Sequence, residues 1–208
     1  MKVFIIGSTG KTGQELVKQA LAKGHTVTAF ARTPSKLAEF SDIQVVQGDV
    51  LEPTTLEQAI PGQDVVISAL GTADGEPVGT VCSDGTRNIL SLMQTHDVTR
   101  YIAVSTIGIE ETKPRMDFLS RFLVPKIIGK ERLDEAQRQE DITQASDVRW
   151  TLVRPARLTD DKPKGSVQAA PDLRTKFMSS LSRADLARFL LEQIDNPTYV
   201  NNAVTVIN

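Results

Sequence analysis

The chain has few of the residues that form disulfides or bind metal ions. Its 208 residues include one cysteine, Cys82, so no internal disulfide can form, and this composition is typical of a reducing compartment. The two histidines, His25 and His96, supply too few ligands for a zinc site even together with Cys82. We therefore expect no metal ion, and we interpret both histidines as structural.

Long apolar runs and an excess of one charge are also missing. No run approaches the roughly 20 apolar residues that a membrane-spanning helix needs. The 24 basic and 26 acidic residues give a net charge of -2, which draws the chain neither to nucleic acid nor to a membrane. The first residues, MKVFIIG, have a strand pattern instead of the basic start of a secretory signal. We expect a soluble cytoplasmic protein.

Short apolar runs recur along the chain and alternate with helical patterns. In the first helical pattern, apolar residues from Leu16 to Leu21 share one face, and Gly24 is placed to end the helix in a left-handed conformation. Near-continuous apolar strands that alternate with helices indicate a parallel sheet covered on both faces. We therefore predict one α/β domain over residues 1–208, a Rossmann-like doubly wound parallel sheet. The expected strands lie at residues 3–6, 26–30, 43–46, 64–70, 101–104, 150–153 and 203–207.

The remaining segments indicate two further helices and two long loops. Residues 79–95 have the apolar spacing of a helix, and the charged residues 130–146 indicate a surface helix with a solvated face at Glu131–Asp141. Prolines interrupt residues 106–125 and 155–180. Because loops of this length in a compact domain are usually functional, we expect these two irregular segments to bind the substrate.

The segment GSTGKTG follows the first expected strand and resembles two phosphate-binding devices. An ATPase phosphate loop needs a glycine five residues before Gly10, but Ile5 stands there, inside the strand. In a dinucleotide turn, Gly7 permits the tight turn, Gly10 lets the backbone approach a pyrophosphate, and Gly13 allows close helix–strand contact. The N–H groups of the following helix then point at the phosphates. We therefore predict a dinucleotide-binding turn at residues 7–13.

The second expected strand ends in FARTPSK, which bears on the choice of dinucleotide. An NAD enzyme places an acidic residue here for the ribose hydroxyls, but this chain has Arg32 and no acid before Glu39. A guanidinium can bind a 2′-phosphate through two hydrogen bonds, and Ser35 and Lys36 follow within reach. The alternative is a solvated arginine at a strand end. We predict NADP as the cofactor.

The next two strand ends fit the same site. Asp49 follows the third expected strand, where a carboxylate could accept the adenine amino group. Gly71 follows the fourth, where a small residue admits the adenine-side ribose. Either residue alone could belong to an ordinary turn. Their occurrence at successive strand ends strengthens the prediction of a dinucleotide site.

These segments together resemble the atypical short-chain dehydrogenases, the NmrA-like branch of NAD(P)-binding proteins. Within that family the likeness is greatest to the reductases of biliverdin-IXβ and of flavins, and it covers nearly the whole chain. The segments that carry it are GSTGKTG, FARTPSKL, VVQGDVL, ALGT, SDGTRNI, VRP and SRADLARFLL.

The resemblance implies a set of cofactor contacts and two catalytic residues. The implied cofactor-binding residues are Gly7, Thr9, Gly10, Lys11, Thr12, Gly13, Arg32, Ser35, Lys36, Asp49, Val50, Leu70, Gly71, Thr72 and Pro155. Ser105 and Thr106, after the fifth strand, would lie beside the nicotinamide and are the implied catalytic residues. The family's reductases have a histidine after the equivalent of Pro155, where this chain has Ala156, so that histidine is not available for proton transfer.

The proton donor of ordinary carbonyl reduction is also missing. Main-branch short-chain dehydrogenases use a Tyr-x-x-x-Lys pair, whose tyrosine protonates the developing alkoxide. Neither Tyr101 nor Tyr199 has a lysine four residues later, and the nearest match has Phe122 in the tyrosine position before Lys126. A conjugated acceptor makes a weaker demand, because its charge is delocalised and its heteroatoms can take protons from water. We therefore expect a conjugated acceptor, which the resemblance specifies as flavin or biliverdin.

The predicted function is an NADPH-dependent oxidoreductase that transfers hydride to a flavin (FMN or FAD, bound as a substrate), to biliverdin, or to both. Basic residues in the segment 154–180 could attract the phosphate or propionates of such acceptors, or could be solvated, with Arg154 paired to a nearby acid. The alternatives are an NADPH quinone reductase and a non-enzymatic NADP-sensing regulator of the NmrA-like branch. We expect a monomer that binds a small-molecule substrate.

Overall fold

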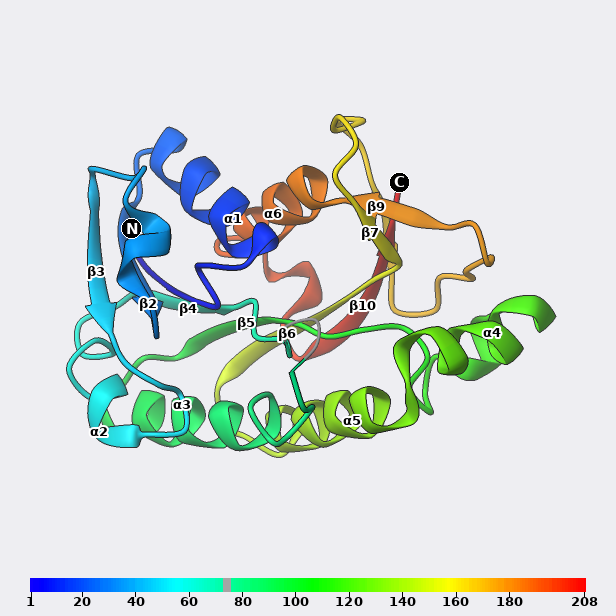
Figure 1. Cartoon of the computed structure of the whole chain (residues 1–208), viewed down its shortest axis with the longest axis horizontal. Helices are drawn as coiled ribbons and strands as arrows, with labels where there is room; N and C mark the ends of the chain where they lie inside the picture. Colours follow the sequence, from blue (N-terminus) through cyan, green and yellow to red (C-terminus); the bar gives the residue numbers. More distant parts are fainter. Residues whose placement is uncertain (73–75) are drawn as a thin grey trace.

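The computed structural model describes residues 1–72 and 76–208, and an eight-stranded sheet forms its centre (Figure 1). A short strand, β8 (Gln168–Ala170), pairs antiparallel at one edge, and all other neighbours are parallel. The parallel strands are β1 (Lys2–Ile6), β2 (Thr26–Ala31), β3 (Ile43–Gln47), β4 (Val65–Ser68), β5 (Arg100–Val104), β6 (Arg149–Pro155) and β10 (Asn202–Ile207). Their order, β3-β2-β1-β4-β5-β6-β10-β8, confirms the predicted Rossmann-like α/β fold.

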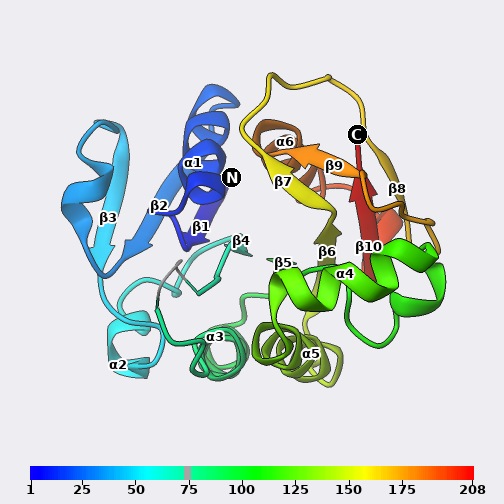
Figure 2. The ribbon, with the colours of Figure 1, turned by 45° about the vertical axis from the view of Figure 1, so that its right-hand side comes forward.

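Helices cover both faces because successive side chains of a strand point to opposite sides. Val3 and Ile5 of β1 pack in one apolar cluster with α1 (Lys11–Ala22) and α6 (Arg183–Glu192). Phe4 and Ile6 pack in a second cluster with α2 (Pro53–Leu56) and α3 (Ser83–Thr95). The helix α5 (Lys130–Gln144) lies beside α3 on that second face (Figure 2). Gly24 ends the first helical segment with φ = +76°, as predicted.

The strand order reverses between β1 and β4. The chain runs outward from β1 through β2 to β3 and then returns to β4 on the other side of β1. Sheets of this kind bind ligands outside the carboxyl ends of the strands at the point of reversal. Gly7, Arg32 and Gly71 each lie just beyond one of these strands, so the topology brings them to the same edge.

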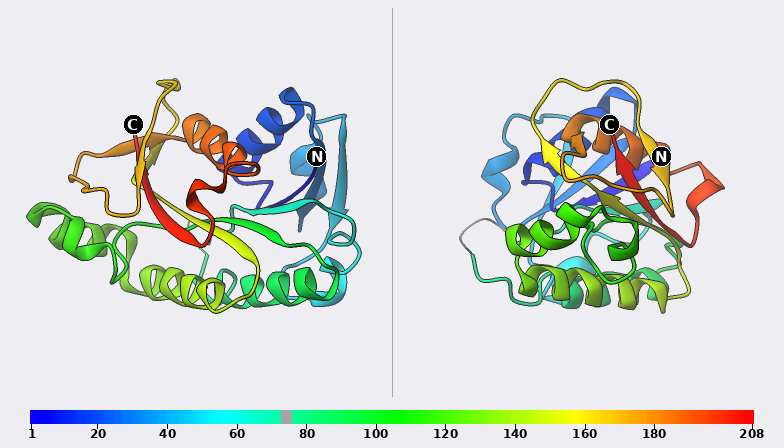
Figure 3. Two further views of the ribbon diagram at one scale, coloured as in Figure 1. Left: turned by 180° about the vertical axis from the view of Figure 1, so that it is seen from behind. Right: turned by 90° about the vertical axis from the view of Figure 1, so that its right-hand side faces the viewer.

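The two segments expected to be irregular contain more regular structure than predicted. The helix α4 (Phe118–Ile128) begins inside the segment 106–125 and ends just beyond it. Asp117 caps this helix by accepting a hydrogen bond from the Ser120 N–H at 2.7 Å. Residues 155–180 include β7 (Arg157–Thr159), which pairs with β9 (Ser180–Ser182). In Figure 3, α4 lies at the end of the molecule opposite β3. Short 3-10 turns are η1 (Pro34–Leu37), η2 (Lys113–Arg115) and η3 (Pro197–Tyr199).

The charged helix α5 has a buried polar face, which corrects the expected solvated face at Glu131–Asp141. Glu135 is buried and accepts hydrogen bonds from the Ser83 N–H at 2.7 Å and the Ser83 hydroxyl at 2.9 Å. A carboxylate at the start of α3 complements the positive end of that helix. Glu140 is fully buried and belongs to a second network described below.

Candidate functional site

The turn between β1 and α1 is tight because glycine occupies its crowded positions. Gly7 has φ = +75°, and a Cβ atom there would lie 2.4 Å from the Ala69 carbonyl oxygen. A Cβ atom on Gly13 would lie 2.1 Å from the Gly7 carbonyl oxygen, so α1 can approach the turn only without that side chain. Gly10 differs, because it has φ = -75° and a Cβ atom would lie 3.4 Å from its nearest neighbour, the Gly7 carbonyl oxygen. The bare backbone at Gly10 therefore leaves room for an outside group.

The first turn of α1 is arranged to stabilise an anion. Gly10 is the N-cap residue, so no side chain caps the first N–H groups of α1, and no acidic residue lies in this turn. The first N–H groups of a helix have no partner within the helix, and they carry the positive end of its dipole. Since this helix end lies at the carboxyl edge of β1, it can hold a phosphate group.

A cleft of about 530 Å³ opens here along the carboxyl ends of β1, β2, β3 and β4. Its volume is in the range of small-molecule sites. The predicted cofactor residues that line this cleft are Gly7, Thr9, Gly10, Lys11, Thr12, Arg32, Lys36, Asp49, Val50, Leu70, Gly71 and Thr72. Three others do not line it: Gly13 lies behind the turn, Ser35 is exposed on η1, and Pro155 is buried at the end of β6.

Arg32 lies at the end of the cleft beyond β2. Its Nη2 atom is 3.6 Å from an oxygen of Glu76, and both side chains are more than half exposed. Lys36 lines the same end, and the Gln14 amide donates to the Lys36 carbonyl oxygen at 3.3 Å, which ties η1 to α1. The sequence reasoning missed Glu76, an acidic residue among the glycines that follow β4. Its pairing with Arg32 is exposed and therefore weak, so an anion of higher charge can replace it.

The turn after β3 fixes Asp49 and Val50. The Asp49 carbonyl oxygen accepts from the Thr55 hydroxyl at 2.9 Å, and one Asp49 carboxylate oxygen accepts from the Leu51 N–H at 3.0 Å. Val50 is buried, and its carbonyl oxygen accepts from the Asn88 amide of α3 at 2.9 Å. These bonds hold the Asp49 side chain and the Val50 backbone at the wall of the cleft.

An ion-pair cluster at the other end of the cleft was not predicted. Arg183, the first residue of α6, lines the cleft next to Lys11. Asp160 pairs with both, at 2.6 Å from Lys11 Nζ and 2.5 Å from Arg183 Nη1. These residues are distant in sequence, so only the contact between α1 and α6 brings them together. The pKa of Asp160 is lowered, chiefly by the Lys11 hydrogen bond and further by Arg183, although desolvation opposes both.

The two implied catalytic residues lie outside the lining of this cleft. Ser105 follows β5, and its hydroxyl donates to Glu140 at 2.5 Å. The Thr106 hydroxyl donates to the Ile107 carbonyl oxygen at 3.1 Å. Both hydroxyls donate within the protein in this arrangement, and their oxygens can still accept a hydrogen bond. The catalytic role implied for the two residues stays a prediction.

Arg154 is structural, as the alternative interpretation of that residue predicted. It is fully buried at the end of β6, with Nε 2.9 Å and Nη2 2.5 Å from the two carboxylate oxygens of Glu140. Nη2 also lies 2.5 Å from Glu111. Burial disfavours the charged guanidinium, but the hydrogen bonds and charges of Glu140 and Glu111 outweigh it and raise the pKa of Arg154. Arg154 is therefore not available to attract the anionic groups of an acceptor.

Tyr101, Lys126 and Cys82 do not replace the missing tyrosine acid. Tyr101 is fully buried in β5, its hydroxyl lies 3.3 Å from that of Thr86, and burial raises its pKa. Phe122 and Lys126 are on the outer helix α4, with Lys126 Nζ 3.8 Å from the ring centre. Cys82 is buried, which raises the pKa of its thiol to about 12, so it is no nucleophile at neutral pH.

Within residues 1–72 and 76–208, no group of three or more His, Cys, Asp and Glu side chains could hold a metal ion. Across the same ranges, no helix is long and apolar enough to cross a membrane.

Comparison with known proteins supports the interpretation of the cleft. A family of proteins described as NAD(P)H-binding matches residues 7–197. The chain is 32% identical to the uncharacterised protein YwnB of Bacillus subtilis (strain 168), and the alignment covers 100% of this chain and 99% of YwnB.

Solved structures share the fold over nearly their whole length. A short-chain dehydrogenase/reductase from Veillonella parvula DSM 2008, in complex with NADP, has a TM-score of 0.83 at 18% identity, covering 99% of this chain and 93% of that one. ChuY, an anaerobilin reductase from Escherichia coli O157:H7, has a TM-score of 0.81 at 21% identity, covering 100% and 97%. These two structures show that the fold is shared, and the family match over residues 7–197 confirms the NAD(P)-binding part of the resemblance. The chain therefore belongs to the NAD(P)H-binding family.

Proposed function

We propose that the protein is an NADPH-dependent reductase that transfers hydride to a conjugated acceptor, either a flavin (FMN or FAD) or biliverdin. The observation that carries this proposal is the distribution of positive charge along the cleft. Lys11 lies beside the glycine turn, whereas Arg32 and Lys36 lie at the opposite end, beyond β2. NADP has a pyrophosphate and a separate 2′-phosphate, so two separated cationic ends suit NADPH better than NADH.

The residues of the cleft suit successive parts of this cofactor. The bare turn at Gly10 and the N-terminus of α1 suit the pyrophosphate, whose nearest side chains would be Thr9, Lys11 and Thr12. Arg32, Ser35 and Lys36 would bind the 2′-phosphate once Arg32 leaves Glu76. Asp49 and Val50 would flank the adenine, and Leu70, Gly71 and Thr72 would line its ribose. Bound NADPH would supply the hydride.

The nicotinamide end of the site lies toward the carboxyl ends of β5 and β6 in this proposal. Ser105, Thr106 and Pro155 are at these ends. Since the Ser105 proton is held by Glu140, its oxygen is free to accept a hydrogen bond from the carboxamide of the nicotinamide. The role that follows for Ser105 is orientation of the ring, not proton transfer.

The chemistry of the acceptor follows from the lack of an acid. A simple ketone needs a proton donor at its oxygen, whereas a flavin or bilin spreads the transferred charge over its ring system and takes its proton from water. Exposed basic residues beyond β6, such as Arg157, Lys162 and Lys176, would attract the phosphate or propionates of such acceptors. The structurally similar anaerobilin reductase adds a reason to include bilins in the test.

The proposal is tested by following the oxidation of NADPH by the purified protein with FMN, FAD, biliverdin isomers and quinones in turn. Acceptor-dependent oxidation is expected with a flavin or a bilin. Turnover of quinones alone would reassign the acceptor. Tight binding of NADPH without turnover of any acceptor would contradict reduction and indicate an NADP-sensing protein.

We also propose that the protein acts as a cytoplasmic monomer on a small-molecule substrate. Light scattering coupled to size-exclusion chromatography tests this, and a mass near 22.7 kDa is expected for the monomer. A mass twice as large would contradict it.

A further inference from the structure

We infer that Arg183 is a further phosphate-binding residue of the cleft and that Asp160 is a built-in competitor for that phosphate. Asp160 holds Arg183 and Lys11 in the free protein, and the pyrophosphate of the cofactor displaces it. The inference rests on the proposed binding of NADPH. It concerns the pyrophosphate, which NADPH and NADH share, and not the 2′-phosphate.

Two helix N-termini bring the cations together. Lys11 begins α1 and Arg183 begins α6, and these helices pack against each other on the same face of the sheet (Figure 2). The Gln19 amide of α1 donates to the Ala184 carbonyl oxygen of α6 at 2.9 Å, which fixes their relative position. The two helices differ, because α1 has no side-chain cap, whereas the start of α6 is capped by Ser182 and carries the Asp185 carboxylate. An anion beside Lys11 and Arg183 is therefore stabilised by the two cationic side chains and by the N-terminus of α1.

Asp160 supplies that anion at the border of the cleft. One of its carboxylate oxygens pairs with Lys11 at 2.6 Å, and the other pairs with Arg183 at 2.5 Å. Lys11 and Arg183 line both the cleft and a neighbouring hollow of about 640 Å³, and Asp160 lines only the hollow. The carboxylate thus reaches the cations from the hollow and not from the cleft in which the pyrophosphate is predicted.

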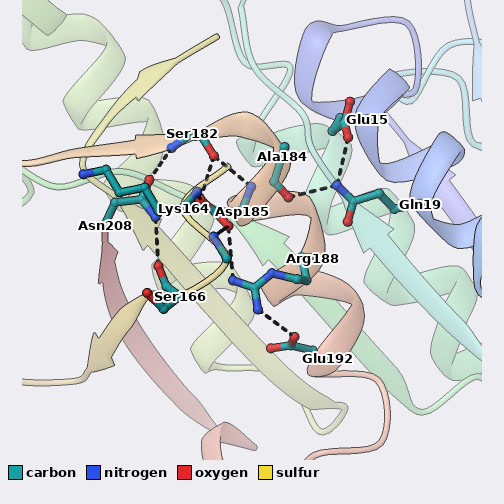
Figure 4. A network of polar contacts seen from close by, with 11 residues as sticks. Glu15, Gln19, Lys164, Ser166, Ser182, Ala184, Asp185, Arg188, Glu192 and Asn208 are labelled. Atoms are coloured by element: carbon teal, nitrogen blue, oxygen red, sulfur yellow. Dashed lines mark hydrogen bonds and ion pairs between the residues drawn. The ribbon is translucent and has the colours of Figure 1, made fainter. Parts of the chain in front are cut away.

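The loop that carries Asp160 is attached to β9 before this residue and to α6 after it. Before it, Leu158 of β7 pairs with Leu181 of β9. After it, the N–H groups of Lys164 and Gly165 donate to the carboxylate of Asp185, at 2.8 and 3.1 Å (Figure 4). With its backbone fixed at both ends, Asp160 needs only a rotation of its side chain to release the cations.

The energies favour exchange. The side chains of Lys11 and Asp160 are 69% and 58% exposed, and exposed ion pairs contribute little because water screens them. A phosphate group accepts two hydrogen bonds from a guanidinium and forms stronger charge-assisted bonds than a single solvated carboxylate. The pyrophosphate also gains the N–H groups of the glycine turn, which Asp160 does not reach from its side. The cofactor therefore outcompetes Asp160, and Asp160 lowers its apparent affinity.

The test compares dissociation constants of NADPH and NADH for variants of the whole chain. Asp160→Asn should lower the dissociation constants of both nucleotides by the same factor, about two- to fivefold, because it removes the two competing ion pairs that Asp160 forms with Lys11 and Arg183. Arg183→Gln should weaken the binding of both nucleotides by about tenfold. Arg183→Lys should have an intermediate effect, because lysine keeps the charge but not the forked geometry. Arg32→Ala should weaken the binding of NADPH and leave the binding of NADH unchanged.

Asp161→Asn is the matched control, since it removes the same charge one residue further along the exposed loop. The inference would be overturned if Asp160→Asn increased nucleotide affinity no more than Asp161→Asn does. It would also be overturned if Asp160→Asn increased the affinity for NADPH but not for NADH. A cooperative thermal unfolding transition, measured for each variant, serves as the control that the variant is folded. If the wild-type protein binds neither nucleotide, the proposed function is wrong. If it binds them but Asp160→Asn has no specific effect, only the inference about Asp160 is wrong.

Discussion

Gly10 and Gly13 are three residues apart in the same turn, yet the structure gives them different reasons to be glycine. A Cβ atom on Gly13 would lie 2.1 Å from the Gly7 carbonyl oxygen, whereas a Cβ atom on Gly10 would lie 3.4 Å from the same oxygen, a distance that can be tolerated. Only the position of a ligand gives Gly10 a reason to lack a side chain. Substitution by alanine separates the two cases.

Gly13→Ala should lower the free energy of unfolding by about 1–3 kcal/mol, because α1 must shift away from the turn. Gly10→Ala should change it by less than about 0.5 kcal/mol and still weaken NADPH binding by about tenfold or more. Urea unfolding and nucleotide titration measure the two quantities. Unchanged NADPH affinity in a folded Gly10→Ala protein would refute the assignment of the pyrophosphate to this turn.

At the scale of whole elements, α5 shows how a charged helix can be internal. Its residues Glu135 and Glu140 are buried, one at the start of α3 and the other against Arg154 of β6. Glu140→Gln should therefore lower the free energy of unfolding by about 3 kcal/mol, because it weakens the pairing of a buried guanidinium. Glu131→Gln, on the exposed side of the same helix, is the matched control and should cost less than about 0.5 kcal/mol. Equal losses in the two variants would show that Glu140 contributes no buried ion pair.

The start of α6 and the loop before β8 depend on the carboxylate of Asp185. Burial opposes its ionisation, but hydrogen bonds from the Lys164 N–H, Ser182, Asn208 and the Gly165 N–H outweigh burial and lower its pKa below 3.8. A depressed pKa in the folded state means that this stabilisation is present above the unfolded pKa and is lost as the pH falls through the folded value.

Asp185→Asn should therefore lower the urea midpoint at neutral pH and flatten the acid dependence of that midpoint below about pH 4. Urea titrations of both proteins at several pH values measure this. Parallel acid profiles for the wild type and the variant would contradict the role of the Asp185 carboxylate. Thr198→Ala, at the distant turn η3, is a control that should leave the acid profile unchanged.

The elements that could be predicted from the sequence are those whose signal is local. Each parallel strand contains a short apolar run, and the helix α1 has a single apolar face. The helix α4 could not be predicted, because Phe118, Phe122 and Ile127 are exposed and Pro125 lies inside the helix. A proline together with the lack of a single apolar face is a sequence pattern typical of a loop.

The candidate site divides in the same way. Arg32, Asp49 and Gly71 could be predicted because each follows a strand, and parallel strands bring their carboxyl ends to one edge. The cluster of Lys11, Asp160 and Arg183 could not be predicted, because its members meet only when α1 packs against α6 and β7 pairs with β9. Such contacts leave no periodic pattern in the sequence.

At the scale of the whole molecule, the cleft joins segments from the first and last parts of the chain. The glycine turn and Arg32 come from the first two strands, whereas Leu158 and Arg183 come from the last quarter. A nucleotide bound here should therefore stabilise the folded chain as a unit, by about 2.7 kcal/mol at a hundredfold excess over its dissociation constant. Thermal unfolding with and without NADPH measures this. An unchanged melting temperature at saturating NADPH would contradict binding to the folded state.

The central claim, that this cleft selects NADPH and delivers its hydride to a conjugated acceptor, is tested most directly by one kinetic comparison. The measurement is kcat/KM for NADPH and for NADH, in the wild-type protein and in Arg32→Ala, with the acceptor that the screen identifies. We predict a preference for NADPH of about tenfold or more in the wild type, from one forked phosphate contact, and near equality in the variant. Equal use of both nucleotides by the wild type, or an unchanged preference in Arg32→Ala, would contradict the account.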